Sequence, residues 1–130
     1  MEDIKYLRTE PIHPTLDELA LAVRVWGREK NINDEVMQYA KINEEIGELA
    51  HEITRGHCGK EKVPSEETID AVGDILVTVI IFADIVGIDP RGALEIAYNT
   101  IKDRKGHTEN GSFIKEEECP VGPDDTKGEK

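Results

Sequence analysis

Apolar and polar side chains follow one another at a spacing of three and four residues over most of the chain, which is the period of an amphipathic helix. The first such segment follows Thr15, and Glu18 three residues later completes a capping box. Its apolar positions are Leu16, Leu19, Val23 and Trp26. The pattern predicts a helix that begins at Thr15.

The second segment starts near Asn33 or Asp34 and ends by Gly56. Its apolar positions are spaced by four, three and four residues, so we expect them to form a buried seam along one helix face. These positions are Ile42, Ile46, Leu49 and Ile53.

The third segment has clear signals at both ends. Ser65 is a candidate N-cap, and Gly87 suits a left-handed stop after a helix that runs to about Val86. From Ile75 onward the segment is apolar nearly all round. We therefore expect this helix at the centre of the assembly.

The fourth segment begins with Asp89 as a cap and Pro90 in the first turn, and we expect it to stop at Gly106. Four of its apolar residues recur at helical spacing and are predicted to point inward. They are Leu94, Ala97, Tyr98 and Ile101.

Beyond the fourth segment the pattern changes. Asn110 and Gly111 predict a turn, after which Phe113 and Ile114 could pack back. Strand-like alternation is absent, so the sequence predicts an all-α fold, a four-helix bundle with short connections. We expect one helical domain over residues 1–115 and a flexible acidic tail over 116–130.

Composition narrows the classes of partner. The 130 residues fit one domain, and the net charge of −12 argues against a nucleic-acid partner, because phosphate backbones are bound by clustered cations. The longest apolar stretch is too short to cross a bilayer, and no secretory signal is visible, so we expect no membrane contact. Cys58 and Cys119 fit reduced thiols in a cytoplasmic protein better than a disulfide framework or a zinc site.

Carboxylates gather on the second helix in the sequence EEIGE, from Glu44 to Glu48, with Glu52 beyond. Glu45, Glu48 and Glu52 fall within roughly 60° of one another at 100° per residue. A solvated acidic face would explain this stripe. Carboxylates beside a buried seam would instead repel one another unless a cation joins them.

Two further carboxylates, Asp70 and Asp74, lie one turn apart on the third helix. Asp74 directly precedes the most apolar run, so it should be partly buried and should need a partner. That partner could be a hydroxyl group, a lysine, or a cation shared with Glu45 and Glu48. Four oxygen donors suit a hard ion, Mg²⁺ or Mn²⁺.

Two glycines and one histidine lie beside these carboxylates. Gly47 and Gly73 weaken their helices, and either close packing or the approach of a substrate would explain them. His51 forms an ExxH pair with Glu48, which is half of a di-iron signature, although a surface or interface histidine is the simpler interpretation.

The sequence EEIGE, followed after a loop by DAVGD and an apolar helix, resembles the MazG-like all-α nucleoside triphosphate pyrophosphohydrolases. The resemblance covers roughly Thr15 to Lys115, and the family pattern is EExxE, a spacer and ExxD. Here Ala71 stands where the Glu of ExxD would fall, and Asp70 precedes it by one position. The resemblance implies metal ligation by Glu45, Glu48 and Asp74, with Asp70 in a supporting place.

The resemblance also implies an activity, the metal-dependent hydrolysis of a nucleoside triphosphate to a monophosphate and pyrophosphate. Glu44 could orient the attacking water as a base, or could be a surface charge. Cationic side chains in and just after the fourth helix could contact phosphate or stabilise the last turn of that helix. They are Lys102, Arg104 and Lys105, and the amide of Asn99 is a further candidate for phosphate contact.

Trp26, the single tryptophan, could stack on a base, although core packing is the more frequent role at its position. Four helices alone would leave the apolar third helix under-covered, so we expect a homodimer or homotetramer with active sites near the interface. The alternatives to an enzyme of this kind are a non-catalytic acidic oligomerisation or regulatory module and, less favoured, redox or ferroxidase chemistry.

Overall fold

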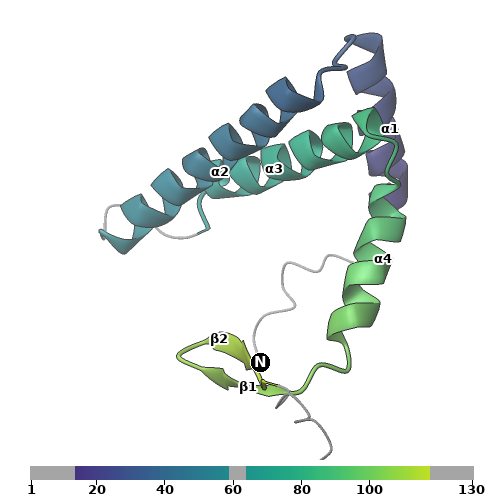
Figure 1. Ribbon diagram of the computed structural model, residues 1–130. Coiled ribbons are helices and arrows are strands. Elements are labelled where there is room, and N and C mark those ends of the chain that lie inside the picture. Colours follow the sequence, from purple (N-terminus) through teal and green to yellow (C-terminus); the bar gives the residue numbers. More distant parts are fainter. Residues whose placement is uncertain (1–13, 59–63, 118–130) are drawn as a thin grey trace, which may run out of the picture. The chain divides into compact units, whose positions relative to one another are not determined.

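A computed structural model describes residues 14–58 and 64–117 of the chain (Figure 1). Its elements are α1 (Leu16–Glu29), α2 (Glu35–His57), α3 (Glu66–Ile85), α4 (Pro90–Ile101), β1 (Gly106–Glu109) and β2 (Ser112–Lys115). The described chain is mostly helical, which confirms the predicted helical character. It divides into two compact units, Met1–Leu94 and Glu95–Lys130, with the boundary inside α4. Most of the predicted tail, from residue 118 onward, lies outside the described residues, as does Cys119.

The helix starts are where the caps predict them. The side chains of Thr15, Asp34 and Ser65 each accept a hydrogen bond from the backbone N–H three residues later. The Asp89 carboxylate accepts bonds from the backbone of the first turn of α4. These local contacts satisfy N–H groups that the helix itself cannot pair.

The helix ends follow the predictions less closely. Gly87 after α3 has a φ of 76°, the left-handed conformation expected for a stop. α4 ends at Ile101 rather than at Gly106, and only a turn continues from it, since the Arg104 N–H donates to the carbonyl of Ile101. The predicted end was therefore wrong.

In the first unit α3 contacts both α1 and α2, as the prediction of a central third helix requires. α2 and α3 lie side by side as an antiparallel pair (Figure 1). Gly27 is the buried residue of α1, and a Cβ atom there would lie 3.2 Å from Cγ1 of Ile81. The missing side chain thus allows α1 to approach α3 closely.

An ion pair also joins α1 to α3. The Asp84 carboxylate accepts hydrogen bonds from Nε of Arg24 at 3.0 Å and from Nε of Arg28 at 2.7 Å. The Asp84 side chain is only 9% exposed. The hydrogen bond from Arg28 acts against burial and lowers the pKa of Asp84 to about 2.

The seam predicted on α2 is only partly buried. Ile42 and Leu49 are half-buried, but Ile46 and Ile53 are 49% and 41% exposed, so their predicted burial is wrong for the single chain. The side chain of Glu45 is buried in their place. The helix is rotated so that part of its carboxylate stripe, rather than the whole apolar seam, faces α3.

The second unit contains a hairpin that the sequence did not predict as strands. β1 and β2 pair antiparallel, with Gly106 opposite Lys115 and Glu109 opposite Ser112. The predicted turn is present, because Asn110 and Gly111 both have positive φ, as a type I′ hairpin turn requires. Four-residue strands are too short to show a clear alternation, which explains the error.

No residue of α4 is buried, so the inward orientation predicted for its apolar side chains is also wrong for the single chain. Within the described ranges, no single helix is long and apolar enough to cross a membrane, and only α3 and α4 taken together, with a 105° bend between them, reach that length and composition.

Candidate active site

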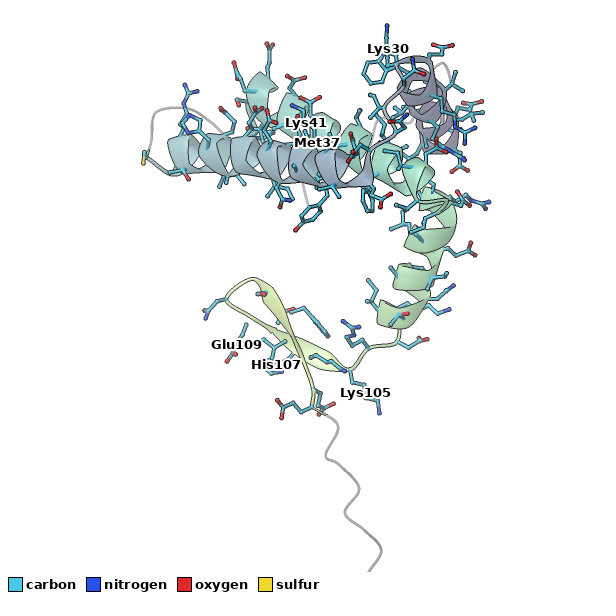
Figure 2. The ribbon with its side chains drawn as sticks, turned by 45° about the horizontal axis from the view of Figure 1, so that its top comes forward. Lys30, Met37, Lys41, Lys105, His107 and Glu109 are labelled. Atoms are coloured by element: carbon cyan, nitrogen blue, oxygen red, sulfur yellow. The ribbon has the colours of Figure 1, made fainter. Side chains whose placement is uncertain are left out.

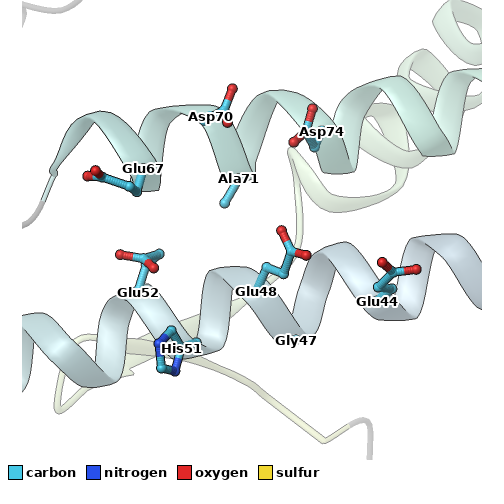
Figure 3. A pocket seen from close by; sticks show the side chains of 9 residues that line it. All are labelled: Glu44, Gly47, Glu48, His51, Glu52, Glu67, Asp70, Ala71 and Asp74. Carbon is cyan, nitrogen blue, oxygen red and sulfur yellow. The ribbon is translucent and has the colours of Figure 1, made fainter.

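α2 and α3 line an open cavity of about 470 Å³, which we call the acidic cavity (Figure 3). Its lining combines six carboxylates with one imidazole and two small residues. The lining residues are Glu44, Gly47, Glu48, His51, Glu52, Glu67, Asp70, Ala71 and Asp74. Figure 3 shows Glu48 reaching from α2 toward α3. Four of the predicted site residues, Glu44, Glu48, Asp70 and Asp74, therefore share one cavity.

Glu45, the remaining predicted ligand, lies next to this cavity rather than on it. It is 6% exposed and lines a second cavity of about 230 Å³ together with Asp74 and Trp26. We call this second space the Trp26 cavity. Asp74 lines both cavities and thus marks the border between them.

Lys41, labelled in Figure 2, is the counter-ion of Glu44 and Glu45 on α2. Its Nζ lies 3.0 Å from Oε1 of Glu44 and 3.1 Å from Oε1 of Glu45. These ion pairs hold the pKa of Lys41 above its ordinary value, with the hydrogen bond to Glu44 as the largest cause. Sequence reasoning missed Lys41, although its spacing of three and four residues from the two glutamates is the usual signal for such a pair.

Asp74 is partly buried, and its carboxylate forms no hydrogen bond or ion pair with any part of the chain that the structure describes. The Thr78 hydroxyl donates to the main-chain carbonyl of Asp74, not to its carboxylate. Burial raises the pKa of Asp74, the nearby charges of Asp70 and Glu45 raise it further, and Lys41 lowers it. The hydroxyl and lysine partners considered for Asp74 are therefore not the ones formed here.

Glu52 is a second carboxylate in which, among the described residues, one oxygen has a partner and the other does not. Its side chain is 12% exposed, and Oε1 lies 3.5 Å from Nη1 of Arg55. Oε2 is buried and has no hydrogen-bond partner in the described part of the chain. A buried acceptor without a partner is unfavourable. Glu52 was recognised as part of the acidic stripe but was not chosen as a ligand.

These observations favour a cation as the missing partner. Asp74 and Glu52, the two residues with unpaired oxygens, line the acidic cavity, and carboxylate oxygens are the donors that Mg²⁺ and Mn²⁺ prefer. In this structure, no three His, Cys, Asp or Glu side chains among the described residues lie close enough to form a ready-made cluster. The donor set fits a hard cation in its chemistry.

Neither glycine is a close-packing residue. A Cβ atom on Gly47 or Gly73 would meet nothing within 4 Å. Gly47 lines the acidic cavity, so its missing side chain leaves space there rather than room for a neighbouring helix. Close packing is thus the less suitable explanation for Gly47.

Ala71 is buried and lines the acidic cavity, at the position where the resembled pattern has a carboxylate. Asp70 lines the same cavity but is exposed. Asp70 therefore provides a carboxylate on this cavity, one residue before the position at which the family pattern has its Glu.

The cationic candidates belong to the second unit. Arg104 and Lys105 line a cavity of about 570 Å³ near the base of the hairpin, together with Lys115. Asn99 and Lys102 are exposed and do not line it. Because α4 ends at Ile101, its last turn holds no basic residue, and the predicted dipole role of these cations is not fulfilled.

Trp26 is 47% exposed, so the more frequent core role does not apply to it in the single chain. Its ring borders the Trp26 cavity instead. His51 lines the acidic cavity beside Glu48 and is exposed. Cys58 is exposed with a free thiol.

Comparison of this chain with protein-family models, with curated proteins and with solved structures finds no match. The family resemblance therefore depends on the two carboxylate motifs and their spacing.

Proposed function

We propose that this protein is a Mg²⁺-dependent hydrolase that converts a nucleoside triphosphate to a monophosphate and pyrophosphate, with Mn²⁺ as an alternative ion. The observation that carries the proposal is the position of Asp74. Its unpaired, partly buried carboxylate borders a cavity that also contains Glu48 and Asp70. Carboxylates from two helices around one cavity are suited to hold divalent ions against a triphosphate.

Glu48 and Asp74 would hold the ion from opposite helices, and Asp70 and Glu45 would complete the set from either side of Asp74. A bound divalent cation supplies charge neutralisation for the phosphates and lowers the pKa of a coordinated water. Glu45 would exchange its ion pair with Lys41 for the cation, because Lys41 is a flexible side chain that lies 46% exposed.

Glu44 is the proposed base. Its side chain is 57% exposed and lines the acidic cavity, where Oε1 accepts from Lys41. A carboxylate in this position can accept the proton of a water that attacks phosphorus. The phosphate-contacting groups are proposed to come from Asn99, Lys102, Arg104 and Lys105.

A homodimer or homotetramer is proposed to carry this activity. Exposed apolar residues continue along the side of the α2–α3 pair away from the carboxylates, at helical spacing on each helix. They are Tyr39, Ile46 and Ile53 on α2, and Val72, Leu76 and Val79 on α3. An apolar stripe of this kind is unusual on a monomer and suits the burial of the same stripe on a second copy.

The same stripe supports a second candidate, a non-catalytic helical oligomerisation module. Oligomerisation is common to both candidates, so it does not separate them. The two differ in whether the acidic cavity turns over a nucleotide.

The deciding experiment incubates the purified protein with a panel of ribo- and deoxyribonucleoside triphosphates in Mg²⁺ or Mn²⁺ and measures monophosphate and pyrophosphate. The proposal predicts equal amounts of the two products, and their loss in Glu48→Gln and Asp74→Asn. Glu29→Gln, at the end of α1 and outside the acidic cavity, is the matched control and should retain activity. Release of orthophosphate, or no turnover of any nucleotide, would contradict the proposal.

A further inference from the structure

The Trp26 cavity has an apolar wall and a polar wall. The ring of Trp26 and the side chains of Val77 and Ile81 form the apolar part, and Gln38 and Glu45 belong to the polar part. A flat, partly polar ligand such as a nucleobase fits this combination, because aromatic rings stack on its faces while polar groups read its edge.

The orientation of the Gln38 amide is fixed by its partner. Gln38 is buried, and its Nε2 donates to the main-chain carbonyl of Thr78 at 3.1 Å. A carbonyl oxygen can only accept, so the nitrogen of the amide must be the atom that faces Thr78. The remaining amide oxygen, Oε1, has no donor within the described ranges and is left to accept from a ligand.

The other polar groups on this cavity do not change that preference. Glu45 and Asp74 carry acceptor oxygens, which a bound cation would use in the proposed hydrolase. Lys41 is the only cationic residue in the lining, and without a cation its ammonium is paired with Glu44 and Glu45. The Thr78 hydroxyl donates to main-chain carbonyls. The acceptor of Gln38 is therefore the group left to contact a base, and it requires a donor.

We propose that the Trp26 cavity selects nucleobases that carry an exocyclic amino group, such as cytosine and adenine, over their oxo counterparts. The amino group would donate to Oε1 of Gln38 while the ring stacks on Trp26. This inference rests on the proposed nucleotide substrate, and Asp74 connects the two, because it borders both the Trp26 cavity and the acidic cavity. An oxo group in the same place would set two acceptors against each other.

The test measures binding of nucleoside monophosphates rather than turnover. Trp26 is the single tryptophan of the chain, so its fluorescence reports on this cavity. Titration with CMP and UMP, and with AMP and IMP, compares an amino with an oxo base at constant shape. We expect the amino member of each pair to bind at least roughly tenfold more tightly.

One variant removes the acceptor. Gln38→Met has a similar length without the acceptor and should bring the affinity ratio within each pair close to unity. Asn43→Leu is the control. The Asn43 amide, like that of Gln38, donates to a main-chain carbonyl, here that of Tyr39 at 2.9 Å, but Asn43 does not line the Trp26 cavity. If Gln38→Met does not fold, the affinity ratios of the wild-type protein for CMP over UMP and for AMP over IMP still test the inference.

Equal affinity for amino and oxo bases, or no fluorescence change with any of the four, would overturn the inference. Pyrophosphate release measured in parallel keeps the two proposals apart. Turnover without base preference removes the inference and leaves the hydrolase. A preference for amino bases without turnover supports the cavity and removes the hydrolase.

Discussion

The ammonium group of Lys41 lies 3.1 Å from the carboxylate of Glu45, one turn further along α2, and Glu45 is the one buried charged residue in the described part of the chain. The same ammonium pairs with Glu44. An internal cation thus occupies the place beside Glu45 where a divalent ion would compete for the carboxylate. Metal binding and this ion pair should therefore be linked.

Replacement of Lys41 by methionine should tighten the binding of Mn²⁺. Removal of the competing cation leaves Glu44 and Glu45 available to the ion, and a change of roughly two- to fivefold is expected because the Lys41 side chain is 46% exposed. Calorimetric titration of the metal-free protein measures it. Lys30→Met, which removes an exposed lysine after α1, should leave the affinity unchanged. Weaker binding in Lys41→Met would show that Lys41 supports the site.

Replacement of Asp74 by asparagine should stabilise the metal-free protein at neutral pH while abolishing its stabilisation by Mg²⁺. The pKa of Asp74 is raised by burial and by Asp70 and Glu45, so its charged form is less favourable in the folded than in the unfolded chain. The protonated Asp74 carboxylate therefore stabilises the folded chain at low pH, and this contribution is lost as the pH rises through the raised pKa.

Thermal unfolding with and without Mg²⁺ measures both effects of Asp74→Asn. The melting temperature without metal should rise by a few degrees, and the increment on adding Mg²⁺ should disappear. Asp17→Asn on α1, an exposed aspartate outside the acidic cavity, is the control and should keep the increment. A lower melting temperature without metal would mean that Asp74 has a stabilising partner.

Helix starts could be predicted from the sequence because caps act over three residues. Thr15 with Glu18 and Ser65 with Thr68 satisfy backbone N–H groups locally, whatever the rest of the chain does. The exposure of Ile46 could not be predicted in the same way, because it depends on how α2 is rotated against α3. The short strands of the hairpin left only the turn at Asn110 as a local signal.

In the candidate site too, the residues placed by local helix periodicity could be predicted, and those placed by contacts between helices could not. Helical periodicity predicts that Glu48 shares a face with Glu45 and Glu52, and Asp70 with Asp74, and all of these except Glu45 line the acidic cavity. Gln38 was missed, because its hydrogen bond is to Thr78, forty residues further along the chain. A contact between helices leaves no periodic trace in the sequence of one of them.

The contribution of Asp84 to the free energy of unfolding should depend on pH in the opposite sense to that of Asp74. Its pKa is lowered to about 2, first by the hydrogen bond from Arg28. The ion pair therefore stabilises the folded chain above the ordinary pKa of an aspartate, and this contribution is lost as the pH falls through about 2. Asp84→Asn should lower the free energy of unfolding at pH 7 by on the order of 1–2 kcal/mol.

Urea unfolding of Asp84→Asn and wild type between pH 7 and the acid limit of folding checks this value. The difference between the two proteins should shrink as the pH falls, because protonation removes the ion pair from the wild type as well. Asp17→Asn serves again as the control for a more exposed carboxylate on α1. A difference that stays constant with pH would show that the packing of Asp84, not its charge, stabilises the contact.

Gly47 and Gly73 provide a matched pair for the role of space at the acidic cavity. A Cβ atom at either position meets nothing within 4 Å, so alanine should stabilise each helix by about 0.5–1 kcal/mol. Only Gly47 lines the acidic cavity. Gly47→Ala should therefore reduce nucleotide turnover, whereas Gly73→Ala should not. Equal turnover in the two variants, measured by pyrophosphate release, would remove Gly47 from the site.

A charge placed in the apolar stripe should dissociate the proposed oligomer. Leu76 is 49% exposed in the single chain and lies between Val72 and Val79 on the face of α3 away from the carboxylates. Burial of a glutamate there against a second copy would be unfavourable, because the charge would lose its hydration without gaining a partner. Leu76→Glu should therefore be a monomer by light scattering at micromolar concentration. Val36→Glu provides the control, since Val36 is 69% exposed in the first turn of α2, outside the stripe. If Leu76→Glu keeps the mass of the wild type, the stripe is not the interface, and if the wild type is itself a monomer, the apolar face must be explained without a second copy.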